Sequence, residues 1–170
     1  MIDRIKKVRA LILDVDGVLT DGKIVFDSQG KDTKNFNVQD GFAIVLLKRA
    51  GFKTAILTAR SSRVVTRRAK DLHIDKVYQN AFPKIKSYQK ILRDFKLKDE
   101  DVCFMGDDLP DLQVLRKVGF AVAVANAVQE IKNCVHYVTQ KKGGEGAVRE
   151  VVELILKGQG KWPDIVAKYA

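Results

Sequence analysis

Short apolar runs alternate with amphipathic stretches along most of this chain. Runs rich in valine, isoleucine and leucine predict β-strands at Val8–Val15, Lys53–Leu57, Lys76–Tyr78, Val102–Met105, Ala121–Val124 and Val135–Val138. Stretches with apolar residues at helical spacing predict helices at about Asp40–Ala50, Ser61–Leu72, Pro83–Phe95, Leu109–Val118, Ala127–Asn133 and Gly146–Leu156. Continuous apolar strands suit a sheet that is covered on both faces. The pattern therefore predicts an α/β fold with a Rossmann-like, doubly wound parallel sheet.

Residues 20–37 break this alternation. Two short strand-like runs, Lys23–Phe26 and Thr33–Asn37, flank a turn that contains Gly30, which predicts a β-hairpin inserted between the first strand and the first helix. A hairpin that projects from the body of a protein needs a surface to pack on. We therefore expect it to serve as a lid or as a contact between subunits.

The C-terminal residues, 158–170, have a different composition from the rest of the chain. Gly158, Gly160 and Pro163 interrupt any regular pattern there, which predicts a mobile tail. No internal repeat or low-complexity tract divides the preceding sequence. We therefore expect one domain over residues 1–157, followed by this tail.

Composition and charge exclude several classes of protein. The chain has 170 residues, 31 lysines and arginines against 21 aspartates and glutamates, and a net charge of +10. The basic residues are spread in short pairs rather than gathered in a stripe with aromatic residues, which favours attraction of small anions over nucleic-acid binding. No stretch approaches the roughly 18 apolar residues of a membrane span. Cys103 and Cys134 lack metal-ligand or redox spacing, so we expect two buried thiols in a cytoplasmic protein.

Polar residues follow three of the predicted strands at the end where ligands bind in such sheets. Asp14 and Asp16 follow the first strand and, being two residues apart on an extended chain, project to the same side. Thr58 follows the second strand. Asp107 and Asp111 follow the fourth and lie one helical turn apart. We expect all of these side chains to gather at one edge of the sheet.

Carboxylates gathered in this way repel one another unless a cation lies among them. A set of oxygen ligands suits Mg²⁺, which commonly combines one or two carboxylates with a substrate phosphate. The sequence thus predicts metal-assisted phosphoryl transfer. Lys84, at the start of the helix after the third strand, would supply a fixed positive charge, and Lys86 is the alternative.

Four motifs in this order resemble those of the haloacid dehalogenase superfamily. They are LILDVDGVL at residues 11–19, the strand Ala55–Thr58, Lys84 near a helix start, and GDDLPD at residues 106–111. The resemblance implies the fold of that superfamily, here essentially capless because only a hairpin follows the first motif. It also implies that Asp14 is a nucleophile forming an aspartyl-phosphate, with Asp16 as the acid and base.

The same resemblance assigns the remaining motif residues. Asp14, the backbone carbonyl of Asp16, and Asp107 would hold Mg²⁺. Asp111 would support Lys84 or a metal-bound water. Thr58, which alone would suggest only a helix cap, would join Lys84 in stabilising the phosphoryl oxygens.

Further segments resemble the 3-deoxy-D-manno-octulosonate 8-phosphate phosphatase family over nearly the whole chain to about Lys157. These are DVDGVLTDG, the hairpin, FNVQDG, LTAR and GGEGAVRE. The resemblance implies hydrolysis of a phosphorylated eight-carbon sugar acid in lipopolysaccharide precursor synthesis. It also implies a homotetramer in which hairpins meet and a neighbouring subunit helps to cover the site. The implied substrate contacts are Asp16, Asn37, Val38, Gln39, Asp40, Gly41, Arg60, Arg68 and Lys84.

Other interpretations remain open at this point. One alternative is that Arg60 and Arg68 are ordinary surface charges on the helix after the second strand. Their two-turn spacing also permits a common face, and an arginine fork suits a substrate carboxylate. Val45 stands where some relatives have a polar or basic residue, which bears on substrate choice. A phosphatase for a nine-carbon acid sugar phosphate is therefore an alternative. A noncatalytic oligomerisation module is another, but such a role would not require both Asp14 and Asp16.

Overall fold

The computed structural model describes residues 1–169 and is built around a parallel sheet. Its strands are β1 (Ala10–Leu13), β4 (Lys53–Leu57), β5 (Lys76–Tyr78), β6 (Val102–Gly106), β7 (Phe120–Ala123) and β8 (Tyr137–Val138). They lie in the order β5-β4-β1-β6-β7-β8, with every neighbouring pair parallel. The chain first adds strands on one side of β1 and then returns to add β6 on the other side. This confirms the predicted doubly wound sheet, whose switch point lies between β1 and β6.

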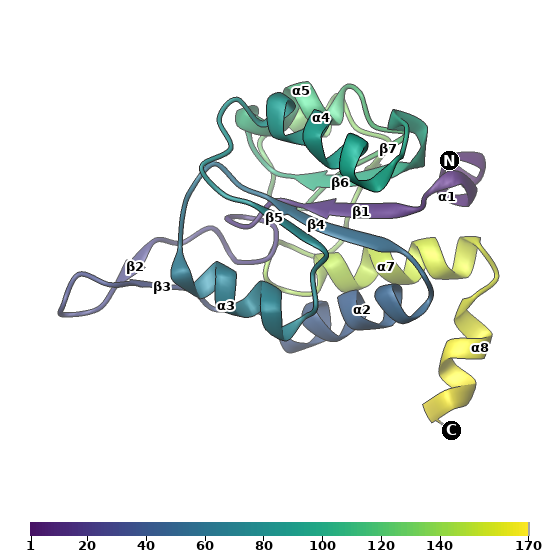
Figure 1. Ribbon diagram of the computed structural model, residues 1–170, viewed down its shortest axis with the longest axis horizontal. Coiled ribbons are helices and arrows are strands. Elements are labelled where there is room, and N and C mark those ends of the chain that lie inside the picture. The colour runs from purple at the N-terminus through teal and green to yellow at the C-terminus, as the bar shows by residue number, and fades with distance from the viewer. Residues whose placement is uncertain (170) are drawn as a thin grey trace.

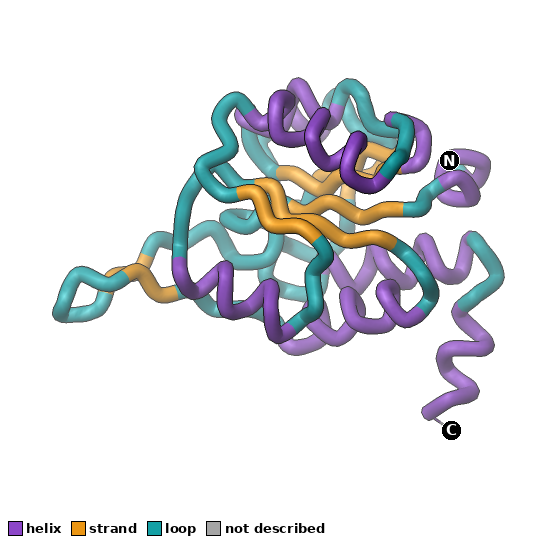
Figure 2. The backbone as a smooth tube through the Cα atoms, in the orientation of Figure 1, coloured by secondary structure: helices purple, strands orange, loops and turns teal. Residues whose placement is uncertain are grey.

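Helices cover both faces of this sheet. The helices of the described residues are α1 (Ile2–Lys7), α2 (Val38–Arg49), α3 (Arg63–Asp71), α4 (Lys84–Phe95), α5 (Leu112–Leu115), α6 (Gln129–Lys132), α7 (Ala147–Gly158) and α8 (Trp162–Val166), with 3₁₀ turns at Asp99–Asp101, Leu109–Asp111 and Ala167–Tyr169. The helices α4 and α5 cover one face, and α2, α3 and α7 cover the other (Figure 1). The strands thus form a middle layer between two helical layers (Figure 2). Every residue of β1, β6 and β7 is buried, as their unbroken apolar runs predict.

The predicted hairpin is present as the antiparallel pair β2 (Val25–Phe26) and β3 (Asp32–Thr33). It projects from the body of the molecule, away from both helical layers (Figure 1). Its apolar side chains Ile24, Val25 and Phe26 are exposed. Apolar side chains on a projecting hairpin suit burial against another surface.

The structure departs from the predicted element boundaries in a few places. The first strand ends at Leu13 because the amides of residues 18, 19 and 20 fold back onto the Val15 carbonyl. The helix predicted at Leu109–Val118 is instead a 3₁₀ turn followed by the short helix α5. Helix α1 was not predicted at all. Cys103 is buried as expected, but Cys134 is only partly so.

The C-terminal segment also contains structure that the sequence did not predict. Helix α8 follows Gly160, and its Ile165 side chain belongs to the hydrophobic core, against which Trp162 also packs. Mobility of residues 158–170 stays a prediction. Among residues 1–169, no helix has the length and apolar character needed to cross a membrane.

Candidate active site

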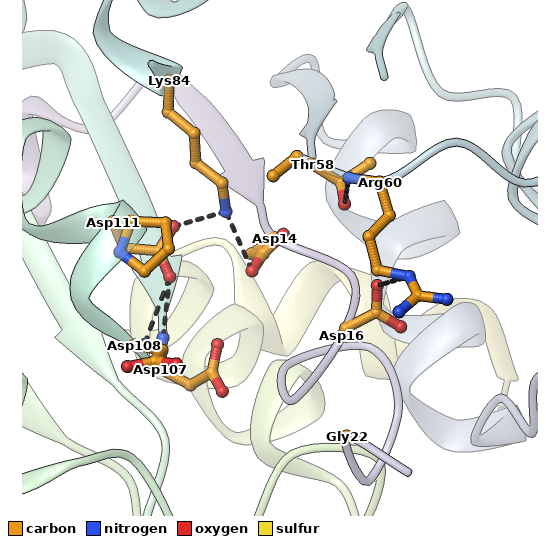
Figure 3. A pocket seen from close by; sticks show the side chains of 11 residues that line it. Asp14, Asp16, Gly22, Thr58, Arg60, Lys84, Asp107, Asp108 and Asp111 are labelled. Carbon is orange, nitrogen blue, oxygen red and sulfur yellow. Dashed lines mark hydrogen bonds and ion pairs between the residues drawn. The ribbon is translucent and has the colours of Figure 1, made fainter. Parts of the chain in front are cut away.

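A cavity opens at the carboxyl ends of β1, β4 and β6, beside the switch point of the sheet. Its lining residues are Asp14, Asp16, Gly22, Thr58, Ala59, Arg60, Lys84, Asp107, Asp108, Pro110 and Asp111. Figure 3 shows their side chains converging from the loops that follow these strands and from the start of α4. The structure therefore brings together residues of all four motifs.

A buried lysine bridges two of the aspartates. The Lys84 Nζ atom lies 2.9 Å from Asp14 Oδ2 and 2.6 Å from Asp111 Oδ1. The Lys84 side chain is only 2% exposed, so its charge is held almost without water. Lys86, the alternative, is exposed to solvent. The position of Lys84 at the first residue of α4 is what directs its side chain into the cavity (Figure 3).

Asp111 uses both of its carboxylate oxygens within the protein. While Oδ1 accepts from Lys84, Oδ2 accepts the backbone N–H of Asp107 at 3.0 Å and that of Asp108 at 3.5 Å. Gly106 leaves room for this side chain, because a Cβ atom there would lie 2.6 Å from Asp111 Cγ. Asp111 therefore positions both Lys84 and the loop that carries Asp107.

The negative charges of Asp14 and Asp107 are only partly balanced by positive charge and hydrogen bonds from the protein. Asp14 Oδ1 is buried with no hydrogen-bond partner. Burial, and then the charge of Asp111, raise the pKa of Asp14 to about 7 although Lys84 opposes the shift. Burial and the charges of Asp14 and Asp111 likewise raise the pKa of Asp107 to about 7. Negative charge is thus concentrated here beyond what Lys84 neutralises.

These residues fit a divalent cation. One carboxylate oxygen from each of Asp14, Asp107 and Asp111 lies within 4.8 Å of the others. Since Asp111 is already satisfied by Lys84 and backbone amides, Asp14 and Asp107 are the groups with free oxygens. An all-oxygen set with two carboxylates suits Mg²⁺ rather than a softer metal.

Glycines shape the loop between Asp14 and the hairpin. Gly17 has a φ of +88°, and a Cβ atom there would lie 2.0 Å from Asp107 Oδ2. Gly143 in turn packs against that loop, since its Cβ would lie 1.7 Å from the Gly17 carbonyl oxygen. The glycine pair at residues 143–144 therefore supports the nucleophile loop and is more than a connection before α7.

Asp16 lies at the rim of the cavity between two cations. Its Oδ2 atom is 3.7 Å from Arg60 Nε, and its Oδ1 atom forms an ion pair with Lys34 Nζ (Figure 3 shows the Arg60 side). Lys34 was not predicted as a site residue. Thr58 is buried beside Asp14, and its hydroxyl accepts the backbone N–H of Arg60 at 3.4 Å. The helix-cap interpretation of Thr58 does not hold, because Ser62 caps α3.

The predicted substrate contacts at residues 37–41 are not among the residues that line the cavity. The Asn37 side chain caps α2 by accepting the N–H groups of Gln39 and Asp40 at 2.8 and 3.2 Å. Asp40 is buried and accepts the N–H groups of Gly146 and Arg149 at 3.2 and 2.8 Å, which caps α7. Val38 is 79% exposed. This segment thus joins two helices next to the site.

Arg68 also lies outside the cavity lining. Its guanidinium carbon is 5.6 Å from the centre of the Phe36 ring, and its buried Nε atom has no partner. Gly41 makes room for it, because a Cβ atom there would lie 2.1 Å from Arg68 Nη2. Arg68 is therefore packed beside residues 36–41 and is not an ordinary surface charge.

The charge of Asp107 yields a prediction about stability without metal. The folded protein holds a proton on Asp107 up to about pH 7, whereas an ordinary aspartate loses it near 3.8. This proton uptake stabilises the folded state at acidic pH and is lost as the pH rises through 7. In chelator, the wild type should therefore lose stability relative to Asp107→Asn between pH 5 and pH 8, by on the order of 1 kcal/mol in urea unfolding.

Excess Mg²⁺ should offset this loss of stability in the wild type. Excess Mg²⁺ at pH 8 stabilises whichever protein binds it in the folded state, so the wild type should gain more than the variant. If Mg²⁺ stabilised both proteins equally, Asp107 would not be a ligand.

Comparisons with known proteins agree with this geometry. A family model described as haloacid dehalogenase-like hydrolase matches residues 70–151. The 3-deoxy-D-manno-octulosonate 8-phosphate phosphatase of Yersinia pestis is 43% identical over 161 residues, which cover 95% of this chain and 86% of that protein. The corresponding enzyme of Escherichia coli K12 is 41% identical over the same shares.

Solved structures of known proteins also closely resemble this chain. The 3-deoxy-D-manno-octulosonate 8-phosphate phosphatase of Moraxella catarrhalis, crystallised with magnesium, phosphate and a KDO molecule, superposes with a TM-score of 0.97. It is 39% identical, and the match covers 99% of this chain and 97% of that chain. With the four motifs gathered in one cavity and this similarity along almost its whole length, the chain belongs to the 3-deoxy-D-manno-octulosonate 8-phosphate phosphatase family of haloacid dehalogenase-like hydrolases.

Proposed function

We propose that this protein is an Mg²⁺-dependent phosphatase that hydrolyses 3-deoxy-D-manno-octulosonate 8-phosphate to the free sugar acid and phosphate. The observation that carries the proposal is the buried Lys84 between Asp14 and Asp111, with Asp107 beside them, in a chain of this family. Within that family the reaction belongs to lipopolysaccharide precursor synthesis. We place the enzyme in the cytoplasm, in keeping with its unpaired Cys103 and Cys134.

The reaction proceeds in two transfers. A carboxylate oxygen of Asp14 forms a bond to phosphorus while the bond from phosphorus to the sugar oxygen breaks, and Asp16 gives its proton to that leaving oxygen. Water then attacks the aspartyl-phosphate, Asp16 takes the proton of the water, and the bond between phosphorus and Asp14 breaks. Asp16 is thereby restored to its protonated form, and the atoms balance over the cycle.

The chain supplies fixed charge and hydrogen bonds for both transfers. Lys84 keeps the Asp14 carboxylate oriented and, with the Thr58 hydroxyl, stabilises negative charge on the phosphoryl oxygens. Asp14, the carbonyl of Asp16, and Asp107 would hold Mg²⁺, which neutralises phosphate charge when bound. Because Lys84 is already fixed by Asp111, it needs little reorganisation during the reaction.

Residues at the rim of the cavity would bind the sugar acid part of the substrate. Arg60 has a 42% exposed side chain there, and its guanidinium suits the substrate carboxylate. We assign Arg68 and residues 37–41, through their backbone and their packing, to the outer part of the substrate site. Residues 1–157 would form the one catalytic domain that carries all these groups.

Phosphate release from a substrate panel tests this proposal. The panel contains the eight-carbon acid sugar phosphate, its nine-carbon analogue and simple hexose phosphates, each with Mg²⁺ or with chelator. We expect selective turnover of the eight-carbon compound that chelator abolishes. Preference for the nine-carbon acid would change the substrate, and no turnover by folded, Mg²⁺-loaded protein would favour the noncatalytic module.

The hairpin supports a further proposal, that the protein is a homotetramer. Ile24, Val25 and Phe26 are exposed side by side on β2 and its approach, where a second hairpin would cover them. Phe26→Asp should therefore reduce the mass measured by light scattering after size exclusion to that of a smaller species. The matched variant Lys31→Asp changes charge on the same hairpin without removing an apolar group and should keep the wild-type mass. A wild type that is already monomeric would refute the tetramer.

A further inference from the structure

Lys34 connects the inserted hairpin to the cavity. It lies one residue beyond β3, and its side chain is 2% exposed, as buried as that of Lys84. Its Nζ atom pairs with Asp16 Oδ1 and lies 3.7 Å from Asp32 Oδ2. A lysine loses much hydration when it is buried in this way, so a buried lysine with defined partners is unlike a solvated surface charge.

The backbone on both sides of Lys34 is anchored. On one side, Thr33 pairs with Val25 in the hairpin. On the other, Phe36 packs against the hydrophobic core and Asn37 caps α2. The ammonium group is therefore delivered to Asp16 from a fixed direction.

The two oxygens of Asp16 consequently have different surroundings. Oδ1 is occupied by Lys34, whereas Oδ2 faces Arg60 at 3.7 Å, a distance too long for a hydrogen bond. A carboxyl group can still accept the Lys34 hydrogen bond at Oδ1 while its proton resides on Oδ2. Lys34 thus selects which oxygen is left to exchange a proton in the cavity.

We propose that Lys34 is a positioning residue that holds Asp16 so that Oδ2 carries the proton to and from the reacting oxygen. This inference rests on the proposed role of Asp16 and extends it to the hairpin. The hairpin is then part of the catalytic apparatus as well as a contact between subunits. Loss of Lys34 should leave Asp16 free to rotate and should weaken protonation of the leaving oxygen.

The test compares leaving groups. An alkyl phosphate such as the sugar acid phosphate leaves as a basic alkoxide and needs that proton, whereas para-nitrophenyl phosphate leaves as a stable phenolate and does not. Because kcat/KM reports steps only through the first irreversible transfer, it isolates this difference. For Lys34→Met we expect kcat/KM to fall by about 10² for the alkyl phosphate and by less than about threefold for the aryl phosphate.

Two further variants control the experiment. Lys31→Met removes a charge from the same hairpin, where Lys31 Nζ donates to Gln29 Oε1, and should change neither value. Lys34→Arg keeps a cation and should recover most of the alkyl phosphate activity. Equal losses on both substrates, or no loss on either, would overturn the proposal. Should Lys34→Met fail to fold, Lys34→Gln, which also removes the cation that pairs with Asp16, takes its place, and an unchanged ratio of alkyl to aryl activity in that variant would overturn the proposal.

The assay also separates this inference from the proposed substrate. Any alkyl phosphate that the wild type hydrolyses serves for the comparison. If the eight-carbon sugar acid phosphate is not turned over, the substrate assignment fails while the ratio of alkyl to aryl activity still decides the role of Lys34.

Discussion

Replacing Asp14 with asparagine is expected to reduce phosphate release by at least about 10⁴-fold. The amide nitrogen and oxygen cannot form the aspartyl-phosphate, yet the side chain keeps its size. Lys84 would retain Asp111 as an ionic partner at 2.6 Å, so the surrounding structure should persist. The measurement is release of phosphate from the eight-carbon acid sugar phosphate under excess Mg²⁺, with single-turnover mixing to detect the covalent intermediate.

A matched control separates this effect from a general loss of charge. Asp71→Asn removes a carboxylate from an exposed i,i+4 pair with Arg67 on α3, outside the lining of the cavity, and should retain wild-type activity. Both variants should show the same circular dichroism as the wild type. Wild-type turnover by Asp14→Asn would mean that another group attacks phosphorus, and the nucleophile would have to be reassigned.

Replacing Lys84 with methionine should have the largest effect on stability and a large effect on rate. Methionine matches the length of the lysine stem but leaves Asp14 and Asp111 buried together without their shared cation. Removing one partner from a buried ionic cluster costs about 3–5 kcal/mol. We expect urea unfolding at pH 7.5 in chelator to show that loss. We also expect kcat to fall by about 10²–10³ in Mg²⁺, since a fixed charge on the phosphoryl oxygens is gone.

Lys86→Met provides the comparison for this variant. Lys86 lies two residues further along α4 and is exposed, so its removal should change stability by less than about 0.5 kcal/mol and leave the rate unchanged. If the two variants lost equal stability, the pairs at 2.6 and 2.9 Å would not carry the stabilisation assigned to them.

The sequence predicted the sheet well because its signals are local. Strands such as Lys53–Leu57 and Lys76–Tyr78 are apolar runs bounded by polar residues, and their predicted limits agree with the structure. The length of the helix after β6 was overestimated, because Pro110 and the Asp108 cap form a 3₁₀ turn before α5 begins. Helix α8 was missed because its stability depends on Ile165 reaching a core that is formed by distant residues.

The site shows the same division between local and distant signals. Asp14, Thr58 and Asp107 each follow a strand, so their convergence could be inferred from topology alone. The pairing of Lys34 with Asp16 joins a hairpin to a strand end over 18 positions, and no spacing rule indicates it. The hydrogen bonds that Asp40 accepts at the start of α7, one buried and one partly buried, likewise depend on how α2 and α7 pack, so the sequence could not indicate that Asp40 caps α7.

The contact between Gly143 and Gly17 has a consequence for the order in which the enzyme matures during synthesis. All four motifs lie between residues 11 and 111, so the ribosome makes every reacting group before it reaches Gly143. The loop after Asp14 nevertheless lacks its supporting backbone until residues 143–144 have emerged and docked. A nascent chain that already carries the full set of chemical groups is therefore still an incomplete catalyst until the segment that begins at Gly143 has docked against the loop after Asp14.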